Sequence, residues 1–332
     1  MNAELLADLL PQDVVGMLAA RCGGAVSFAD CRVIGPLGVS QLSRLFRCSV
    51  PGHGPLALKF CVASDGKPDV DQARLQFAAL KRLERLAAEH GSQARVVRAL
   101  DLIEEHACLV MEWIEGRSVA AELASPLSSD ADITRWARES GRWLKDFHAM
   151  RRLADRPTNC AAMLAQLADE ALAAPQLRRN RSFVHGDEVL RRLAPRIAEM
   201  PVPVAQHHGD FKAENLMITG GELIGLDIAA DWEDAVTLDL AKFIRDITFR
   251  SWRPTGWMLG RRFDAIVGGL LDGYGWRDPA SPPLLWARLH GLLRFWAGME
   301  VAPLDPIRES YGRYRFEQQA TELAAALRAG LE

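Results

Sequence analysis

The residues best suited to chemistry lie in one short stretch of the C-terminal half of the chain. Asp210 closes a His-Gly-Asp tripeptide, Asn215 comes five residues later, and Asp227 follows the next apolar segment. The carboxylate of Asp210 can accept a proton from an incoming hydroxyl, whereas Asn215 and Asp227 offer hard oxygen donors of the kind Mg²⁺ prefers. A hairpin with its turn at Gly220-Gly221 would bring both donors to the same end of a sheet. The spacing suits metal-assisted phosphoryl transfer.

A second His-Gly-Asp tripeptide provides an internal comparison. It spans 185–187, but the residue five positions after Asp187 is Arg192, and neither an apolar strand nor a further Asp follows. The tripeptide alone therefore carries little information. We expect the copy at 185 to lie on the surface of a helix, and we assign chemistry only to the copy that ends at Asp210.

The wider pattern resembles a known family, the aminoglycoside phosphotransferase/choline kinase group of protein-kinase-like enzymes. The residues that carry the resemblance are, in order, His208-Gly209-Asp210, Asn215-Leu216, Asp227 and Asp239-Leu240-Ala241. The resemblance implies an enzyme that moves the γ-phosphate of ATP, with Mg²⁺, to a small-molecule hydroxyl. It also implies Asp210 as the catalytic base, Asn215 and Asp227 as metal ligands, and Asp239 as a structural acid that opens a helix.

Lysine is scarce in this chain, which draws attention to Lys59. Only six of the 40 basic residues are lysines. Lys59 lies in the alternating segment 56–62, where a lysine on the inward face needs a reason. A solvated lysine on an edge strand is the alternative. The resemblance favours a nucleotide role, because the lysine of this strand in the family pairs with the α- and β-phosphates.

The resemblance also implies the rest of a nucleotide site. A Gly-rich turn would cover the phosphates, since glycine lets backbone N–H groups approach oxyanions. A hinge between the lobes would hydrogen-bond adenine through its backbone. An ordinary hairpin turn and a strand leaving its sheet are the alternatives for these two segments. The expected contacts are Gly35, Gly38 and Ser40 for the phosphates, and Glu112, Trp113 and Ile114 for adenine.

One position departs from the family pattern. Kinase-like folds carry a Glu on the helix of the small lobe that orients the strand lysine, and the equivalent position here is Gln76. Gln can hydrogen-bond Lys59 but cannot neutralise its charge. An alignment shifted by one turn would bring one of several nearby acids into that place instead. The departure motivates an alternative function, a nucleotide-binding pseudo-kinase with weak or no turnover.

Two adjacent histidines allow another interpretation of the same stretch. His207 and His208 with Asp210 could form the metal site of a hydrolase, but adjacent side chains point in different directions, and no other nearby His completes a transition-metal set. We favour a structural role for His208, which in the family bonds the backbone around the catalytic loop. We interpret His148, at the end of a helical pattern, as a capping or packing residue.

Two kinds of element must position these residues. Segments 26–63 and 96–113 have strand patterns with turns at Pro and Gly, and a helical pattern over 70–90 lies between them and stops at Gly91. On this helix, an apolar face is expected through Leu75, Ala79, Leu83 and Leu86. These elements predict a small β-rich lobe, a mixed sheet with one helix, over residues 1–113.

The rest of the chain has a different pattern. Helical periodicity covers 130–150 and 160–200, with breaks expected at Pro175 and Pro195, and it resumes after the hairpin at 215–228. We therefore expect an α+β, two-lobed protein-kinase-like fold, with a nucleotide-binding N-lobe and a larger helical C-lobe over residues 114–332 that holds the catalytic residues and the acceptor.

Composition restricts the class of protein. With 49% apolar and 25% charged residues, the chain is typical of a folded globular protein with room for two domains. A formal charge of −3 disfavours bulk binding to nucleic acid. The six cysteines are scattered and suggest free thiols, and the acidic N-terminus does not resemble a signal peptide. A cytoplasmic location is expected, and the oligomeric state stays open.

The acceptor is the least defined part of the prediction. Asp231, Glu233 and Asp234 could form an acidic rim for a cationic acceptor, although solvated loop charges are the alternative. Arginines interleaved with aromatic residues over 245–262 could instead hold an anionic or sugar acceptor or touch a membrane surface. A packed amphipathic surface with snorkelling arginines is the favoured interpretation of that stretch. An aminoglycoside, choline, a sugar or an amino-alcohol all remain open as acceptors.

Overall fold

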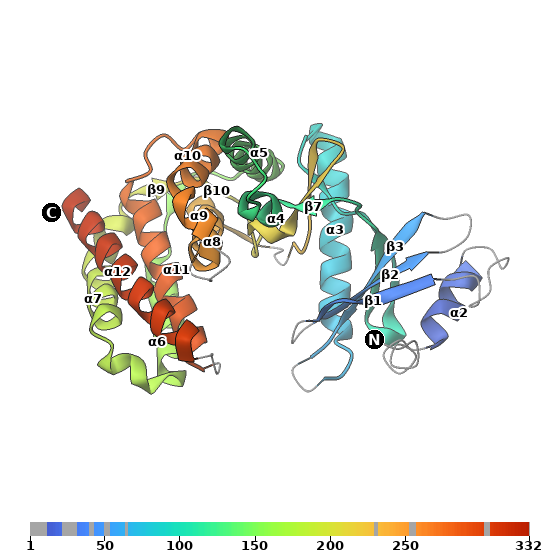
Figure 1. Cartoon of the computed structure of the whole chain (residues 1–332), viewed down its shortest axis with the longest axis horizontal. Coiled ribbons are helices and arrows are strands. Elements are labelled where there is room, and N and C mark those ends of the chain that lie inside the picture. Colours follow the sequence, from blue (N-terminus) through green and yellow to red (C-terminus); the bar gives the residue numbers. More distant parts are fainter. Residues whose placement is uncertain are drawn as a thin grey trace. The chain divides into compact units, whose positions relative to one another are not determined.

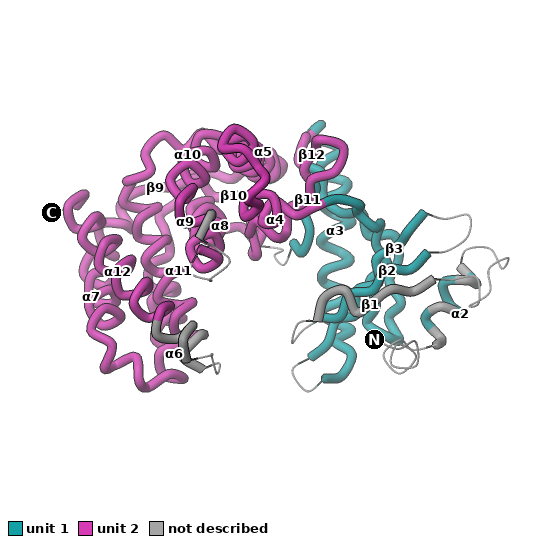
Figure 2. Tube along the Cα trace, viewed as in Figure 1, with its two compact units in different colours: residues 1–91, 95–116, 224–228 teal, residues 92–94, 117–223, 229–332 magenta. Residues whose placement is uncertain are grey.

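The computed structural model describes residues 12–21, 32–39, 43–49, 54–63, 66–228, 232–251, 257–301 and 306–331. The chain forms two compact units, which are coloured separately in Figure 2. Unit 1 comprises residues 1–91, 95–116 and 224–228, and unit 2 comprises residues 92–94, 117–223 and 229–332. Both units are discontinuous in sequence. The short segment that carries Asp227 belongs to the unit formed mainly by the first third of the chain.

Unit 1 is built on a five-stranded antiparallel sheet, and Lys59 lies on its middle strand. The paired strands confirm both hairpin-like pairs expected from the sequence. Lys59 is in register with Leu45 on one side and Leu109 on the other, so the edge-strand alternative is wrong. In spatial order the strands are β1 (Arg32–Val39), β2 (Ser43–Ser49), β3 (Pro55–Cys61), β6 (Cys108–Glu112) and β5 (Ala99–Ile103), and the 3₁₀ turn η2 (Glu104–His106) joins β5 to β6.

Helix α3 (Val70–His90) has the bounds that the sequence predicts. The Asp69 carboxylate accepts a hydrogen bond from the backbone N–H of Gln72 at 3.0 Å, and Gly91 ends the helix in the left-handed conformation, with φ +60°. The expected apolar face is wrong at Leu75, which is 63% exposed. The buried residues are Ala73, Ala79, Leu80 and Leu83. The buried face of α3 is therefore shifted around the helix from the predicted one. It includes two alanines, whose small side chains let the helix approach the sheet closely.

The two faces of the sheet are covered by different helices. Val14 and Leu18 of α2 (Gln12–Arg21) pack in one buried cluster with Phe46 and Leu58 of the sheet. Side chains alternate along β3, so Lys59 and Cys61 point to the opposite face. Helix α3 covers that face, where it contacts β3, β5 and β6, and Figure 1 shows it beside the sheet.

Two short strands, β11 and β12, lie between the predicted metal ligands Asn215 and Asp227. In unit 1, Ile224 and Gly225 of β12 (Glu222–Gly225) pair in parallel with β4 (Arg95–Val96). In unit 2, β11 (Leu216–Thr219) pairs antiparallel with β7 (Arg117–Ser118). The turn between β11 and β12 uses Gly220 and Gly221 with φ of +56° and +88°, as expected for a tight glycine turn.

Unit 2 is mainly helical, and Trp286, Trp296 and Phe316 are among its fully buried side chains. None of the described helices is both long and apolar enough to cross a membrane. The helices are α4 (Val119–Ala124), α5 (Asp130–Ala149), α6 (Cys160–Ala173), η3 (Pro175–Arg179), α7 (Arg181–Ala198), α8 (Val236–Ser251), α9 (Trp257–Arg261), α10 (Phe263–Tyr274), α11 (Pro282–Val301) and α12 (Pro306–Leu331). The strands are β8 (Arg156–Pro157), β9 (Pro201–Val202), β10 (Val204–Gln206) and β13 (Glu233–Ala235).

Helix α7 differs from the prediction at one of its two prolines. The helical stretch breaks at Pro175 as expected, but α7 continues through Pro195 to Ala198. Pro195 removes one backbone hydrogen bond. The buried side chains of Leu193 and Ile197 on either side hold the last turn in place. The second His-Gly-Asp tripeptide lies in this helix as predicted, although Gly186 is buried against Leu293 of α11 rather than exposed.

Helices α5 and α10 approach each other through glycines. A Cβ added to Gly273 would lie 1.9 Å from the carbonyl oxygen of Arg138, and one added to Gly141 would lie 2.1 Å from that of Leu270. Only glycine fits at either position. This seam brings the end of α10, with Tyr274, next to His148 at the end of α5.

Candidate active site

The catalytic loop predicted from the sequence is a bend held by backbone and histidine contacts. Gly209 has φ +80°, a conformation that favours glycine. His208 is fully buried, and its Nδ1 accepts a hydrogen bond from the backbone N–H of Asp210 at 3.3 Å. The backbone N–H of His208 donates to Oδ2 of Asp239 at 2.8 Å. His208 therefore has the structural role favoured from the sequence.

Asp210 is held by two lysines. Nζ of Lys212 lies 2.9 Å from Oδ2 of Asp210, and Nζ of Lys242 lies 2.9 Å from Oδ1. Lys242 also donates to the carbonyl oxygen of Gly209 at 2.5 Å. Burial alone would raise the pKa of Asp210, but the positive charges of Lys242 and Lys212 outweigh it and hold the pKa below its ordinary value. Asp210 is therefore a carboxylate at neutral pH.

Sequence reasoning did not identify Lys212 or Lys242 as site residues. Both belong to the six lysines of the chain, and that scarcity was the signal that could have found them. Lys242 lies one helical turn after Asp239 on α8, so its side chain can reach the loop that Asp239 holds.

Asn215 contacts the proposed base directly. It ends the 3₁₀ turn η4 (Ala213–Asn215), and its Nδ2 donates to the backbone oxygen of Asp210 at 2.9 Å and to Oδ2 of Asp210 at 3.0 Å. The amide has one donor group and one acceptor oxygen. Because the donor is committed to Asp210, Oδ1 is the atom that can bind a metal ion.

Asp239 is the buried centre of the loop. It lies in the first turn of α8 and has no exposed surface. Its Oδ2 is 3.2 Å from Nε2 of His148, and its Oδ1 is 3.2 Å from Nε2 of His207. Burial alone would raise the pKa of Asp239, but the neighbouring histidines lower it overall. Asp239 is thus the structural acid that the resemblance implies.

His148 joins the loop to the α5–α10 seam. Its Nδ1 lies 2.9 Å from the hydroxyl oxygen of Tyr274, opposite the contact of its Nε2 with Asp239. Burial lowers the pKa of His148, which favours the neutral ring. In that form the Tyr274 hydroxyl donates to Nδ1, and Nε2–H donates to Asp239. The expected packing histidine therefore also links α5, α8 and α10.

Unit 1 holds two further residues predicted from the sequence, Lys59 and Asp227, and brings them into contact. Nζ of Lys59 lies 2.6 Å from Oδ1 of Asp227. The Lys59 side chain is 12% exposed and that of Asp227 is 50% exposed, so Oδ2 of the carboxylate can bind a further cation. Asp227 has φ +52°, which is uncommon for a residue other than glycine and turns the chain sharply after β12.

Gln76 has a different contact from the one expected. Its Oε1 accepts a hydrogen bond from the thiol of Cys61 at 3.9 Å. Cys61 lies two residues after Lys59 on the same face of β3, so Gln76 faces the strand near the lysine. The acid that neutralises Lys59 comes from the segment after β12 and not from α3.

The predicted adenine hinge begins at the last residue of β6, and two of its three backbone donors are already used. The N–H of Glu112 donates to the carbonyl of Arg98, and that of Trp113 donates to the carbonyl of Pro55, each at 3.1 Å. Neither can donate to a base as well. Ile114, at the same strand end, is the remaining predicted residue whose N–H can do so.

The predicted phosphate-covering turn lies inside a strand. Gly35 and Gly38 belong to β1, where the pairing with β2 shifts between Ile34 and Gly38. The expectation of an open turn at these glycines is therefore wrong. The Gly-Pro-Leu-Gly segment forms a bulge, because Pro36 has no N–H to give to the ladder. Ser40 lies outside the described residues.

Several described residues of the two acceptor cues have structural partners. Glu233 forms an ion pair with Arg151, and Asp234 accepts from the backbone N–H of Ala235 at 2.7 Å, while Asp231 lies outside the described residues. Arg250 pairs with Asp246 at 2.9 Å, and Arg262 pairs with Asp130 at 3.2 Å. These acids and arginines thus have structural partners.

Comparison with known proteins gives a family match over most of the chain. A family model described as the phosphotransferase enzyme family matches residues 34–292. No curated relative matches the chain. Among solved structures, a choline kinase from Cryptosporidium parvum Iowa II is similar with 13% identity and a TM-score of 0.59, covering 95% of this chain and 98% of that one.

Two further structures are similar at the same level. An amicoumacin kinase in complex with AMP-PNP, Ca²⁺ and amicoumacin has 13% identity and a TM-score of 0.56, and the alignment covers 97% of this chain and 96% of that one. A glucosamine kinase has 14% identity and a TM-score of 0.52, with 92% and 83% covered. At these identities the likeness establishes the fold, which is α+β and protein-kinase-like as predicted.

Proposed function

The chain belongs to the phosphotransferase enzyme family, and on that premise we propose that it transfers the γ-phosphate of ATP, with Mg²⁺, to a hydroxyl of a small molecule. The observation that carries this proposal is the contact between Asp210 and Asn215. It joins the carboxylate that would receive the hydroxyl proton to the amide whose free oxygen would bind the metal. The kinase relatives support the coarser statement, a small-molecule phosphotransferase.

The proposed step balances in a simple way. The acceptor oxygen forms a bond to the γ-phosphorus, the bond from that phosphorus to the β,γ-bridging oxygen breaks, and ADP leaves. The acceptor proton passes to Asp210. Three hydrogen-bond donors from Lys212, Lys242 and Asn215 occupy the Asp210 carboxylate. A carboxylate has about four lone-pair sites, so one is left for the acceptor hydroxyl.

Asn215 in unit 2 and Asp227 in unit 1 each have the chemistry of a magnesium ligand. Asn215 Oδ1 and the exposed Oδ2 of Asp227 are hard oxygen donors, and Mg²⁺ commonly takes only one or two protein ligands beside phosphate oxygens and water. Among the residues that the structure describes, no cluster of three or more His, Cys, Asp or Glu is arranged to hold a metal. When bound, the ion would neutralise charge on the β- and γ-phosphates.

The remaining residues of the set have positioning roles. Lys59, neutralised by Asp227 in this structure, would contact the α- and β-phosphates, as the family resemblance implies. Lys212 and Lys242 would keep Asp210 ionised and in place. Phosphoryl transfer depends mainly on such positioning and on charge neutralisation, and side chains held by ion pairs before the substrate binds supply both.

A screen of acceptor alcohols tests the proposal. Purified protein is incubated with Mg·ATP and with aminoglycosides, choline, sugars or amino-alcohols, and ADP release is followed together with the mass of the acceptor. We expect ADP release that depends on one class of acceptor and a product heavier by one phosphoryl group. Stabilisation by Mg·ATP without transfer to any acceptor would favour the pseudo-kinase alternative that Gln76 motivates.

A further inference from the structure

The last turns of α8 carry an arginine that reaches the catalytic loop. Nε of Arg250 donates to both carboxylate oxygens of Asp246, four residues earlier on the helix, at 3.0 and 2.9 Å. Nη2 of Arg250 donates to Oε2 of Glu214 at 2.6 Å. Glu214 belongs to η4, next to Asn215. One guanidinium therefore binds an acid of the helix and an acid of the loop.

The Arg250–Asp246 pair is mostly withdrawn from water. The two side chains are 18% and 17% exposed, whereas the side chain of Glu214 is 58% exposed. Burial raises the pKa of Asp246, and the charge of Arg250 opposes this effect without cancelling it. Among the described residues, Arg250 is the one cation in ion-pair contact with Asp246. A buried carboxylate that loses such a partner is left with an uncompensated charge.

Lys212 has two further acids near it besides Asp210. Burial alone would lower the pKa of Lys212, but the contact with Asp210 and the weaker effects of Glu214 and Asp246 raise it overall. Nζ of Lys212 lies 2.9 Å from Oδ2 of Asp210. Three acids thus attract one lysine, and Asp210 is the acid that Lys212 contacts.

The two acids that compete with Asp210 for Lys212 are the two that Arg250 binds. Without Arg250, Asp246 would have no contacting cation, whereas Asp210 would still have Lys242 at 2.9 Å. Opposite charges attract most strongly where water is excluded. The buried Asp246 carboxylate would therefore draw Lys212 away from Asp210.

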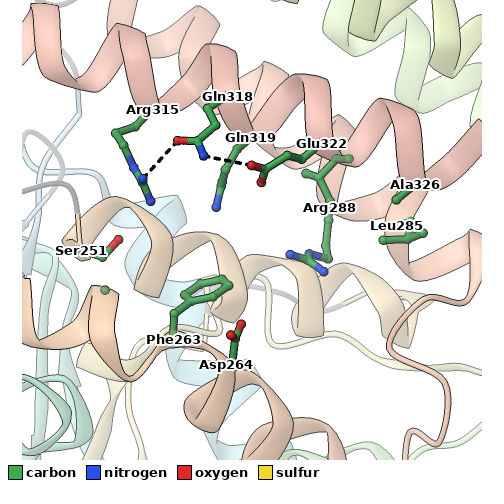
Figure 3. Close-up of a pocket in the computed structure, with 12 residues that line it drawn as sticks. Ser251, Phe263, Asp264, Leu285, Arg288, Arg315, Gln318, Gln319, Glu322 and Ala326 are labelled. Carbon is green, nitrogen blue, oxygen red and sulfur yellow. Dashed lines mark hydrogen bonds between the residues drawn. The ribbon is translucent and has the colours of Figure 1, made fainter.

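The other side of the α8 end faces a cavity. Ser251 lines this cavity, which has a volume of about 400 Å³, together with residues of α9, α10, α11 and α12, among them Arg288 and Arg315 (Figure 3). The described residues that line the cavity include Ser251 but not Arg250. The charge of Arg250 is thus directed to the catalytic loop and not to the cavity.

From this arrangement, and resting on the proposed function, we infer that Arg250 is a positioning residue for phosphoryl transfer, which neutralises Asp246 and Glu214 and so keeps Lys212 on the Asp210 carboxylate. Arg250 acts through Lys212 and does not touch the reacting atoms. When Lys212 leaves, Oδ2 of Asp210 loses one of its two donors. The carboxylate then departs from the orientation that the acceptor hydroxyl requires, and a displacement of about 1 Å can cost about 10²-fold in rate.

Steady-state kinetics with Mg·ATP and the best acceptor of the screen test the inference. Arg250→Gln should lower kcat at least about ten-fold, while the KM for ATP changes less than about three-fold. Arg250→Lys keeps the positive charge and should recover most of the loss. The matched control is Arg191→Gln, because Arg191 pairs with Asp187 at 2.9 Å and at the same spacing of four residues on α7. It should match wild type.

A double variant separates this role from a merely structural one. If Arg250 neutralises a competitor for Lys212, Arg250→Gln combined with Asp246→Asn should restore kcat to within about three-fold of wild type. Glu214 is solvated and should compete only weakly. If Arg250 only fastens η4 to α8, removing Asp246 as well restores nothing. A wild-type kcat in Arg250→Gln, or no recovery in the double variant, would overturn the inference.

A crystal structure of Arg250→Gln gives a measurement that does not depend on activity. We expect Nζ of Lys212 within about 4 Å of the Asp246 carboxylate and out of contact with Asp210. Lys212 still bound to Asp210 in that variant would overturn the inference, whatever the kinetics. Displacement of Lys212 in the variant, combined with a wild-type protein that phosphorylates no acceptor, would contradict only the proposed function.

Discussion

The ammonium group of Lys242 lies 2.9 Å from the Asp210 carboxylate and 2.5 Å from the carbonyl oxygen of Gly209. One cation thus holds both the side chain of the proposed base and the backbone of the loop that presents it. Lys212 binds the other carboxylate oxygen, so Asp210 is ionised and oriented before any substrate arrives.

Replacing Lys242 with Met should raise the pKa of Asp210, because Lys212 would be the one contacting lysine left to oppose burial. The acid limb of the plot of kcat/KM against pH, which requires the ionised carboxylate, should therefore move to higher pH. Lys145→Met, at an exposed position of α5, should leave the profile unchanged. An acid limb at the same pH in Lys242→Met would show that Lys242 does not govern this ionisation.

The Lys59–Asp227 pair should matter for nucleotide binding. Lys59→Met removes the charge proposed to face the phosphates, so the KM for ATP should rise about ten-fold or more, a loss of about 1.4 kcal/mol. Asp227→Asn should weaken the thermal stabilisation that Mg·ATP gives. Lys81→Met is the matched control, since Lys81 is exposed on α3 and pairs with Glu84 at 3.1 Å. Unchanged ATP binding in Lys59→Met would remove the lysine from the site.

Two glycines of α10 should respond differently to substitution by alanine, because Gly273 packs against α5 and Gly268 does not. Gly273→Ala places a Cβ 1.9 Å from the Arg138 carbonyl, and overpacking of this kind costs about 1–3 kcal/mol. A Cβ added to Gly268 would meet no atom within 4 Å, so Gly268→Ala should stabilise the helix by about 0.5–1 kcal/mol. Urea denaturation measures both, and a similar free energy of unfolding for the two variants would contradict the seam.

His290 should make stability depend on pH. Burial lowers its pKa to about 4. The contact of Nε2 with the carbonyl oxygen of Met163 at 3.0 Å acts in the opposite direction but does not outweigh burial. Below about pH 6.5 the unfolded chain takes up a proton that the folded chain does not, so stability falls as the pH is lowered, by about 1.6 kcal/mol between pH 6.5 and 5. His290→Gln keeps a donor for Met163 and should lose this part of the dependence.

The control for that measurement is His185→Gln, at a half-buried position of α7. It should follow the wild-type dependence of the free energy of unfolding on pH. His148, whose pKa is lowered mainly by burial, contributes in the same direction in all three proteins. Parallel curves for His290→Gln and wild type would exclude His290 as the titrating group.

Local signals explain what the sequence predicted well. The bounds of α3 follow from Asp69 and Gly91, which act within a few residues of themselves, and the glycine turn after β11 is equally local. The bulge at Gly35–Gly38 was missed because a Pro between glycines is compatible with a turn or with an irregular strand. The pairing of β1 with β2 decides between them.

Contacts between distant residues explain what the sequence could not predict. Lys59 and Asp227 are 168 positions apart, and no periodicity connects them. Lys242 reaches Asp210 only because Asp239, one turn earlier, binds the loop from the same helix. The cavity lined by Ser251, Arg288 and Arg315 needs residues of α8, α9, α10, α11 and α12 to come together, so no one segment predicts it.

The central claim is that Asp210 receives the acceptor proton, and one comparison tests it most directly. With the best acceptor from the screen, Asp210→Asn should lower kcat by at least about 10²-fold, while Mg·ATP still raises the melting temperature. Asp187→Asn, in the second His-Gly-Asp tripeptide, should keep the wild-type kcat. A wild-type kcat in Asp210→Asn, or an equal loss in Asp187→Asn, would contradict the account.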